Sequence, residues 1–187
     1  MPMSPLSAPT PPAAAIEAYL RGKDGNRPHL LRAAFTDAAR LVMEVNTTGI
    51  AFPAGAIGRA EIADVLVRRF NQAWENITTL CIGEPPAADA AAFTCDWFVA
   101  MSGKQDGGVR AGCGRYDWVF DQRSGLACSL TIVIDAMVSV PVDVDTMADW
   151  ASALPYPWCG APRLPRGAPD VAALRAVLQR LHPAGRS

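Results

Sequence analysis

The chain has 187 residues, half of them apolar, and a formal net charge of −1. That length supports one domain with a substantial core and some appended segments. No cluster of basic residues is larger than a short pair such as Arg68-Arg69, which argues against a nucleic-acid partner, and no apolar run is long enough to cross a membrane. The low net charge favours association of the chain with itself.

Residues 1–11 are rich in Pro and Ser and contain neither the basic nor the apolar region of a signal peptide, so a flexible leader is expected there. The five cysteines include no pair at C-x-x-C spacing. This usage is typical of buried, reduced thiols and argues against a zinc or redox motif. We therefore expect a cytoplasmic protein without a metal site.

The first part of the chain has apolar residues at helical spacing, and the middle part has alternating residues typical of strands. Helices are expected over residues 12–21, 26–35 and 58–74, with a strand over 39–45. Further strands are expected over residues 77–83, 91–102, 109–120 and 126–136. Helices followed by a run of strands indicate an α+β domain, residues 12–140, in which a curved antiparallel sheet packs on N-terminal helices. Gly112 and Gly114 inside one long strand indicate curvature or a bulge.

The last segment, residues 141–187, breaks the strand pattern. Short helices are expected over 144–154 and 169–181, with aromatic residues such as Tyr156 and Trp158 between them. Aromatic side chains in a loop-like segment need to be covered. We therefore expect this extension to wrap over the domain or over a partner subunit.

Four segments together resemble the nuclear-transport-factor-2-like superfamily, in its branch of ketosteroid isomerases and SnoaL-like polyketide cyclases. They are A-I-E-A-Y-L-R-G, L-L-R-A-A-F-T-D-A-A-R-L-V-M-E-V, G-R-A-E-I-A-D-V-L and R-Y-D-W-V-F-D-Q-R-S-G-L-A, within residues 13–136. The resemblance implies a cone-shaped barrel: a sheet curled around a pocket whose mouth the first helices partly close. It also implies a homodimer formed through the outer face of the sheet.

The same resemblance gives a mixed set of site residues. Tyr19 stands where ketosteroid isomerases have a tyrosine that donates a hydrogen bond to the substrate oxygen, and Tyr116 falls near their second donor. Their general base falls on or near Met43, which cannot accept a proton. The hydrogen-bonding half of that site is thus expected here without its base.

An apolar pocket with one or two hydroxyl groups follows from the strand pattern, and it would suit a small apolar or aromatic ligand. Its expected lining is Leu41, Met43, Trp97, Trp118, Phe120, Leu130 and Ile132. The alternative is that these side chains simply fill the core. Asp96 and Asp117 alternate with the aromatic residues, so they would enter the pocket, with Arg115, only if the two faces were reversed. In that arrangement Asp117 would be a catalytic residue together with Tyr19 and Tyr116.

Two functions are compatible with these patterns. One is a ligand-binding protein that acts as an isomerase, cyclase or dehydratase without a cofactor. The other is a non-catalytic, dimeric binding or interaction module. An enclosed volume with Tyr19 beside a carboxylate would favour the enzyme, and a filled core would favour the module.

Overall fold

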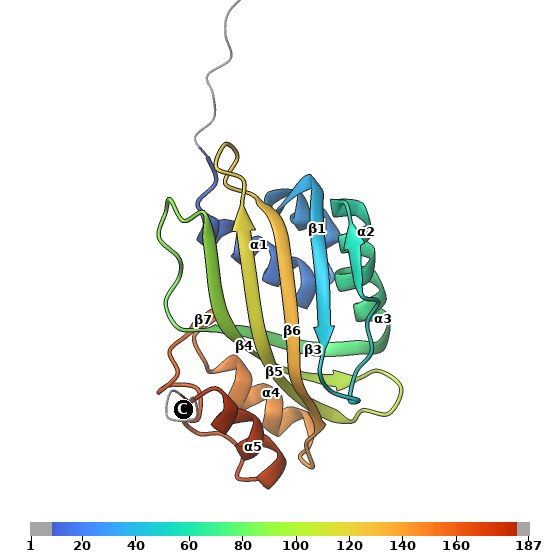
Figure 1. Ribbon diagram of the computed structural model, residues 1–187. Coiled ribbons are helices and arrows are strands. Elements are labelled where there is room, and N and C mark those ends of the chain that lie inside the picture. The colour runs from blue at the N-terminus through green and yellow to red at the C-terminus, as the bar shows by residue number, and fades with distance from the viewer. Residues whose placement is uncertain (1–8, 183–187) are drawn as a thin grey trace, which may run out of the picture.

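A seven-stranded curved sheet forms the centre of the computed structural model, which describes residues 9–182 (Figure 1). Its strand order is β2-β1-β6-β5-β4-β3-β7. The strands are β1 (Phe35–Val45), β2 (Gly55–Ile57), β3 (Trp74–Ile82), β4 (Ala92–Gly103), β5 (Val109–Phe120), β6 (Ala127–Ser139) and β7 (Trp158–Cys159). Most neighbours are antiparallel, but β1 pairs with β6 and β3 with β7 in parallel. The α+β class is confirmed, while the expected barrel is wrong because the sheet stays open at β2 and β7.

Helices pack on both faces of this sheet. They are α1 (Pro12–Asp24), the 3-10 helix η1 (Pro28–Ala33), α2 (Arg59–Ala63), the π-helical turn η2 (Asp64–Arg69), α3 (Phe70–Ala73), α4 (Val144–Ser152) and α5 (Ala172–Arg180). In Figure 1, α1 lies behind the sheet, and α4 and α5 lie at its lower end.

The expected end of the second helix was wrong. Phe35 does not end a second helix: it begins β1 and pairs with Ala127 of β6, so tertiary pairing overrides the helical spacing. The helix expected over 58–74 is confirmed over residues 59–73; it contains a π-helical turn, and Trp74 begins β3 by pairing with Gly103.

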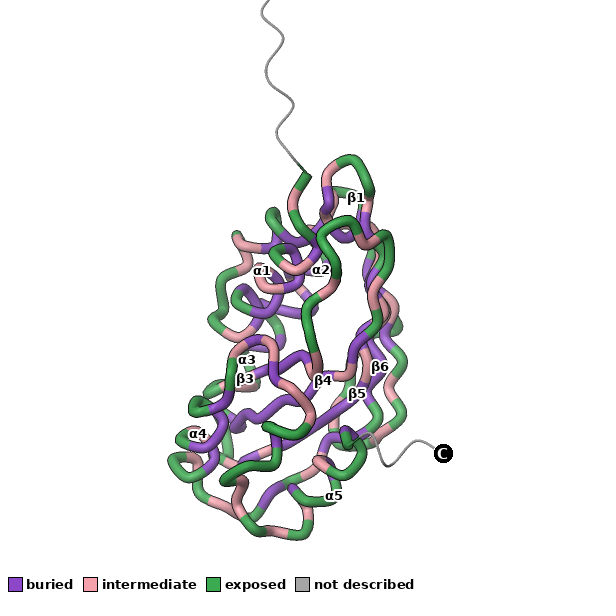
Figure 2. The backbone as a smooth tube through the Cα atoms, turned by 90° about the vertical axis from the view of Figure 1, so that its left-hand side faces the viewer, coloured by how far each residue is buried: buried purple, intermediate pink, exposed green. Residues whose placement is uncertain are grey.

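The two faces of the sheet pack against different parts of the chain. The inner face, defined here as the face toward α1 and α2, carries Trp97, Tyr116 and Trp118 in a first core that we call the inner core. The outer face carries Phe98 and Cys113 in a second core, the outer core, which is completed by side chains of α4 and α5. In Figure 2, many residues of β4 and β5 are buried (purple), and the exposed residues (green) lie mostly in the loops.

The C-terminal extension packs on the sheet of its own chain. Helix α4 contacts β3 and β4, and α5 contacts β5 and β6. Asp143 caps α4: its carboxylate accepts hydrogen bonds from the backbone N–H and the hydroxyl of Thr146. Trp150 of α4 is buried and donates from Nε1 to the carbonyl of Arg166. Helices α4 and α5 therefore cover part of the outer face of the sheet in the same chain.

Candidate functional site

A small cavity of about 40 Å³ lies within the inner core, between the end of α1, the sheet and the loop that follows β1. It has room for a water molecule or one small ligand group. Its lining consists of Tyr19, Lys23, Met43, Ile50, Phe52, Leu66, Phe70, Thr79, Trp97, Val99, Tyr116, Ile132, Ile134 and Met137. The wall is mostly apolar, and the polar groups on it are two phenols, one ammonium group, one hydroxyl and one indole N–H.

Two tyrosines from different elements meet at this cavity. Tyr19 lies on α1 and Tyr116 on β5, and their ring centroids are 6.0 Å apart in an edge-on arrangement. Their hydroxyls share a hydrogen bond. Burial is the main cause that raises the pKa of both Tyr19 and Tyr116, so both phenols stay protonated at neutral pH. The bond between the two phenols uses one of these protons and leaves the other to be donated to a ligand.

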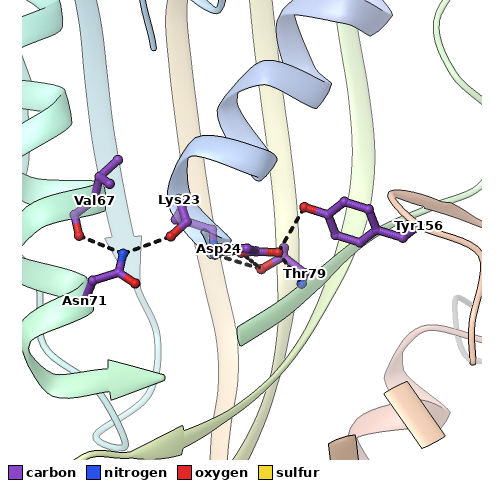
Figure 3. A network of polar contacts seen from close by, with 6 residues as sticks. All are labelled: Lys23, Asp24, Val67, Asn71, Thr79 and Tyr156. Atoms are coloured by element: carbon purple, nitrogen blue, oxygen red, sulfur yellow. Dashed lines mark hydrogen bonds and ion pairs between the residues drawn. The ribbon is translucent and has the colours of Figure 1, made fainter. Parts of the chain in front are cut away.

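Lys23 adds a positive charge to the cavity wall. It sits in the last turn of α1, is 6% exposed, and its Nζ lies 2.7 Å from both Asp24 Oδ1 and Thr79 Oγ1 (Figure 3). The ammonium group also lies 4.9 Å from the centroid of the Phe70 ring. A buried charge is tolerated because these partners replace its water shell.

Asp24 ties this charge to the sheet and to the C-terminal extension. Its carboxylate accepts hydrogen bonds from the Thr79 backbone N–H at 2.8 Å and from the Thr79 hydroxyl at 2.8 Å. The Tyr156 hydroxyl donates to the same carboxylate at 3.3 Å. On the other side, Asn71 Nδ2 donates to the carbonyls of Lys23 and Val67, 2.8 Å away in each case. The π-helical turn before Asn71 brings this amide to the end of α1 (Figure 3).

Trp97 forms one side of the cavity because a glycine leaves space for its ring. Trp97 pairs with Gly114 of β5, and a Cβ atom at Gly114 would lie 2.8 Å from Trp97 Cζ2 and 1.8 Å from the carbonyl oxygen of Val133. The pairing of β5 with β6 shifts register between Cys113 and Gly114, in agreement with the bulge expected there. The buried Nε1 of Trp97 has no hydrogen-bond partner within the described residues, so it remains available as a donor.

The residues expected from the sequence divide into three groups. Tyr19, Met43, Trp97, Tyr116 and Ile132 line the cavity. Leu41, Trp118, Phe120 and Leu130 are buried in the inner core but away from the cavity lining.

Asp117 belongs to the third group. It lies on the outer face, where it pairs with Arg115 at 3.1 Å and accepts a hydrogen bond from Thr94. Because side chains alternate along β5, Asp117 cannot reach the cavity that Tyr116 lines, so the reversed arrangement of faces that would make Asp117 catalytic is not the one observed.

Lys23, Asp24 and Thr79 were not expected from the sequence. Lys23 and Asp24 belong to a Gly-Lys-Asp-Gly stretch that has the composition of a turn, which gave no sign of burial. The signal that the sequence offered was a charged pair, Lys23-Asp24, directly after the apolar stripe of a helix.

Over residues 9–182, no three His, Cys, Asp or Glu side chains are grouped so that they could hold a metal ion. In the same range, none of the helices is both long and apolar enough to cross a membrane.

The fold was compared with known proteins. No family model matches the chain, and no curated protein matches its sequence. Among solved structures, an NTF2-like protein from Burkholderia thailandensis has a TM-score of 0.52 and 15% identity, over 67% of this chain and 91% of that one. A putative isomerase from Rhodopseudomonas palustris has a TM-score of 0.54 and 12% identity, over 66% and 87%. An NTF2-like protein of unknown function from Exiguobacterium sp. 255-15 has a TM-score of 0.50 and 19% identity, over 65% and 98%. At these identities the comparisons support the fold, so the expected nuclear-transport-factor-2-like fold is confirmed.

Proposed function

We propose that this protein binds a small apolar or aromatic molecule with one hydrogen-bond-accepting oxygen, and acts on it as a cofactor-free isomerase, cyclase or dehydratase. One observation carries the proposal. The cavity has a mostly apolar wall that carries the donor groups of Tyr19, Lys23 and Tyr116, and the bond between the two phenols leaves one phenolic proton for a ligand. An oxygen with free lone pairs, as in a ketone or phenol, is the complementary ligand group.

The chemistry that suits this arrangement is polarisation of a carbonyl group. Donors that are fixed before the reaction stabilise negative charge as it develops on the ligand oxygen. Tyr19 and Tyr116 keep their protons because burial raises the pKa of each, and Lys23 supplies a full positive charge in a site shielded from water. Formation of an enolate from a ketone would be favoured in such a site.

A ligand larger than the present cavity can be admitted by side chains that adapt. Met43 and Met137 line the cavity, and methionine side chains rearrange at low cost. Ile50 and Phe52 cover it from the loop after β1, and both are only half-buried. Movement of this loop would enlarge the site without changing the sheet.

The test uses two probes of nearly equal shape. Cyclohexanone carries an acceptor oxygen, and methylenecyclohexane has a carbon in its place. We expect calorimetry to detect cyclohexanone binding that weakens about tenfold in Tyr19→Phe, since a buried hydrogen bond is worth about 1 kcal/mol and more when the acceptor is left unpaired. Methylenecyclohexane should bind both proteins equally. Val119→Ala, on the exposed part of the outer face, is the control. Equal binding of cyclohexanone to wild type and Tyr19→Phe would refute the assignment of Tyr19.

A second candidate is a binding module that holds the same ligand without changing it. It is favoured by one observation: the cavity lining contains neither a carboxylate nor an imidazole that could remove a proton from carbon. The two functions differ in D₂O. An enzyme should exchange the α-protons of bound cyclohexanone faster than buffer does, as measured by ¹H NMR, whereas a module should bind the ketone without exchange.

A further inference from the structure

The C-terminal extension reaches the cavity region through a short extended segment, residues 155–160, which we call the strap. Its strand β7 lies parallel to β3, with Trp158 opposite Cys81 and Cys159 opposite Ile82. The Cys81 N–H donates to the carbonyl of Pro157 at 2.7 Å. The strap therefore continues the sheet beyond β3, the strand that carries Thr79.

Two side chains of the strap contact α1. The Tyr156 hydroxyl donates to Asp24 Oδ2 at 3.3 Å, and Trp158 Nε1 donates to Glu17 Oε1 at 3.2 Å. The Tyr156 ring also lies against the Arg21 guanidinium, 5.5 Å from centroid to Cζ. Burial and the nearby Asp24 charge raise the pKa of Tyr156, so this phenol keeps the proton that it donates.

The Asp24 carboxylate is the link between the strap and the cavity. One of its oxygens accepts from Lys23, and the other accepts from Tyr156 and from the Thr79 backbone (Figure 3). The carboxylate side chain is 8% exposed, so protein donors rather than water decide where it lies. Without the Tyr156 hydroxyl, Oδ2 would keep only the Thr79 N–H of these two donors.

We propose that Tyr156 is a positioning residue for the cavity, and that the strap is part of the site. Through Asp24, the Tyr156 hydroxyl holds the Lys23 ammonium against the cavity wall. The effect on ligand binding rests on the function proposed above, while the effect on Lys23 does not.

The experiment takes advantage of the lysine content of the chain. Lys23 and Lys104 are its two lysines, and Lys104 is exposed, so Lys104 is an internal reference for amine reactivity. The full chain is treated with N-hydroxysuccinimidyl acetate, and acetylation of each lysine is followed by mass spectrometry. The variant is Tyr156→Phe, which keeps the ring on Arg21 and removes only the hydroxyl.

We expect the ratio of Lys23 to Lys104 acetylation to rise about fivefold in Tyr156→Phe, as loss of one buried hydrogen bond predicts. The matched control is Trp158→Phe, which removes the other side-chain hydrogen bond from the strap to α1 without touching Asp24. Its ratio should match wild type. An unchanged ratio in Tyr156→Phe would overturn the proposal, and so would an equal rise in both variants, because the strap would then act only as a cover.

Ligand binding separates the two proposals. In Tyr156→Phe, cyclohexanone should bind several-fold more weakly than to wild type, and methylenecyclohexane should bind as before. If cyclohexanone does not bind the wild-type chain, the proposed function fails, but the acetylation ratio still decides the role of Tyr156. If cyclohexanone binds both proteins equally while the acetylation ratio rises, Tyr156 positions Lys23 without serving the ligand, and the strap is not part of the site.

Discussion

The two ends of the inner core contain similar side chains but differ in how completely they are packed. At one end, the Trp118 ring stacks on Phe35 and Phe120 with centroid distances of 5.9 and 6.1 Å, and Leu130 closes the cluster. We call this the closed end. At the cavity end, Tyr116 and Ile132 continue the same faces of the same two strands, but they border an empty volume.

The difference lies in what packs against the sheet. The start of β1 supplies Phe35, which is fully buried, to the closed end. The cavity end is covered by Ile50 and Phe52 from an irregular loop, and by the last turn of α1 with Lys23. The strand faces are thus equivalent, and the elements opposite them decide where a ligand can enter.

The largest expected effect is on stability, and it distinguishes Trp118 from Trp97, two tryptophans on the inner face of the sheet. Trp118→Ala should reduce the free energy of unfolding by about 3–5 kcal/mol, because the deleted ring is fully buried and contacts four other aromatic rings, two of them, Phe35 and Phe120, in the closed end. Trp97→Ala should lose less, because part of its ring already faces the cavity. Urea unfolding of both variants measures the difference. Equal losses would contradict the comparison, since they would mean that both ends are packed alike.

The sequence predicted the faces of these strands but not the two ends. Alternation along β5 correctly placed Tyr116 and Trp118 inside and Asp117 outside, because strand geometry is local. It could not separate Tyr116 from Trp118, because the groups that pack over them come from other elements. The polar side of the cavity was missed for the same reason: the partners of Lys23 and Asp24, Thr79 and Tyr156, lie 56 and 132 residues away.

A smaller effect should appear when one end is overfilled. Ala127 is fully buried and pairs with both Phe35 and Phe120, so Ala127→Val should cost about 1–3 kcal/mol of stability through crowding in the closed end. Val99→Ile adds less carbon and does so at the cavity, so its free energy of unfolding should match wild type within about 0.5 kcal/mol. It should also weaken cyclohexanone binding. A comparable loss of stability in both variants would show that the cavity end has no room to spare.

The smallest effect is a difference in alkaline stability that only the cavity end can produce. Burial raises the pKa of Tyr116 above its ordinary value of 10.0, whereas the closed end is built from Phe, Trp and Leu side chains that do not titrate. Below pH 10 the phenol is neutral in both the folded and the unfolded chain, so its protonation costs no stability. Above pH 10 the unfolded chain releases this proton and the folded chain keeps it, so stability falls as pH rises.

Tyr116→Phe removes this contribution of the phenol to the pH dependence. The unfolding free energy of the variant should decline less steeply than that of wild type between pH 10 and 11, by up to about 1.4 kcal/mol per pH unit. Identical slopes would mean that Tyr116 ionises as readily in the folded chain as in the unfolded one, and the cavity end would then be open to water.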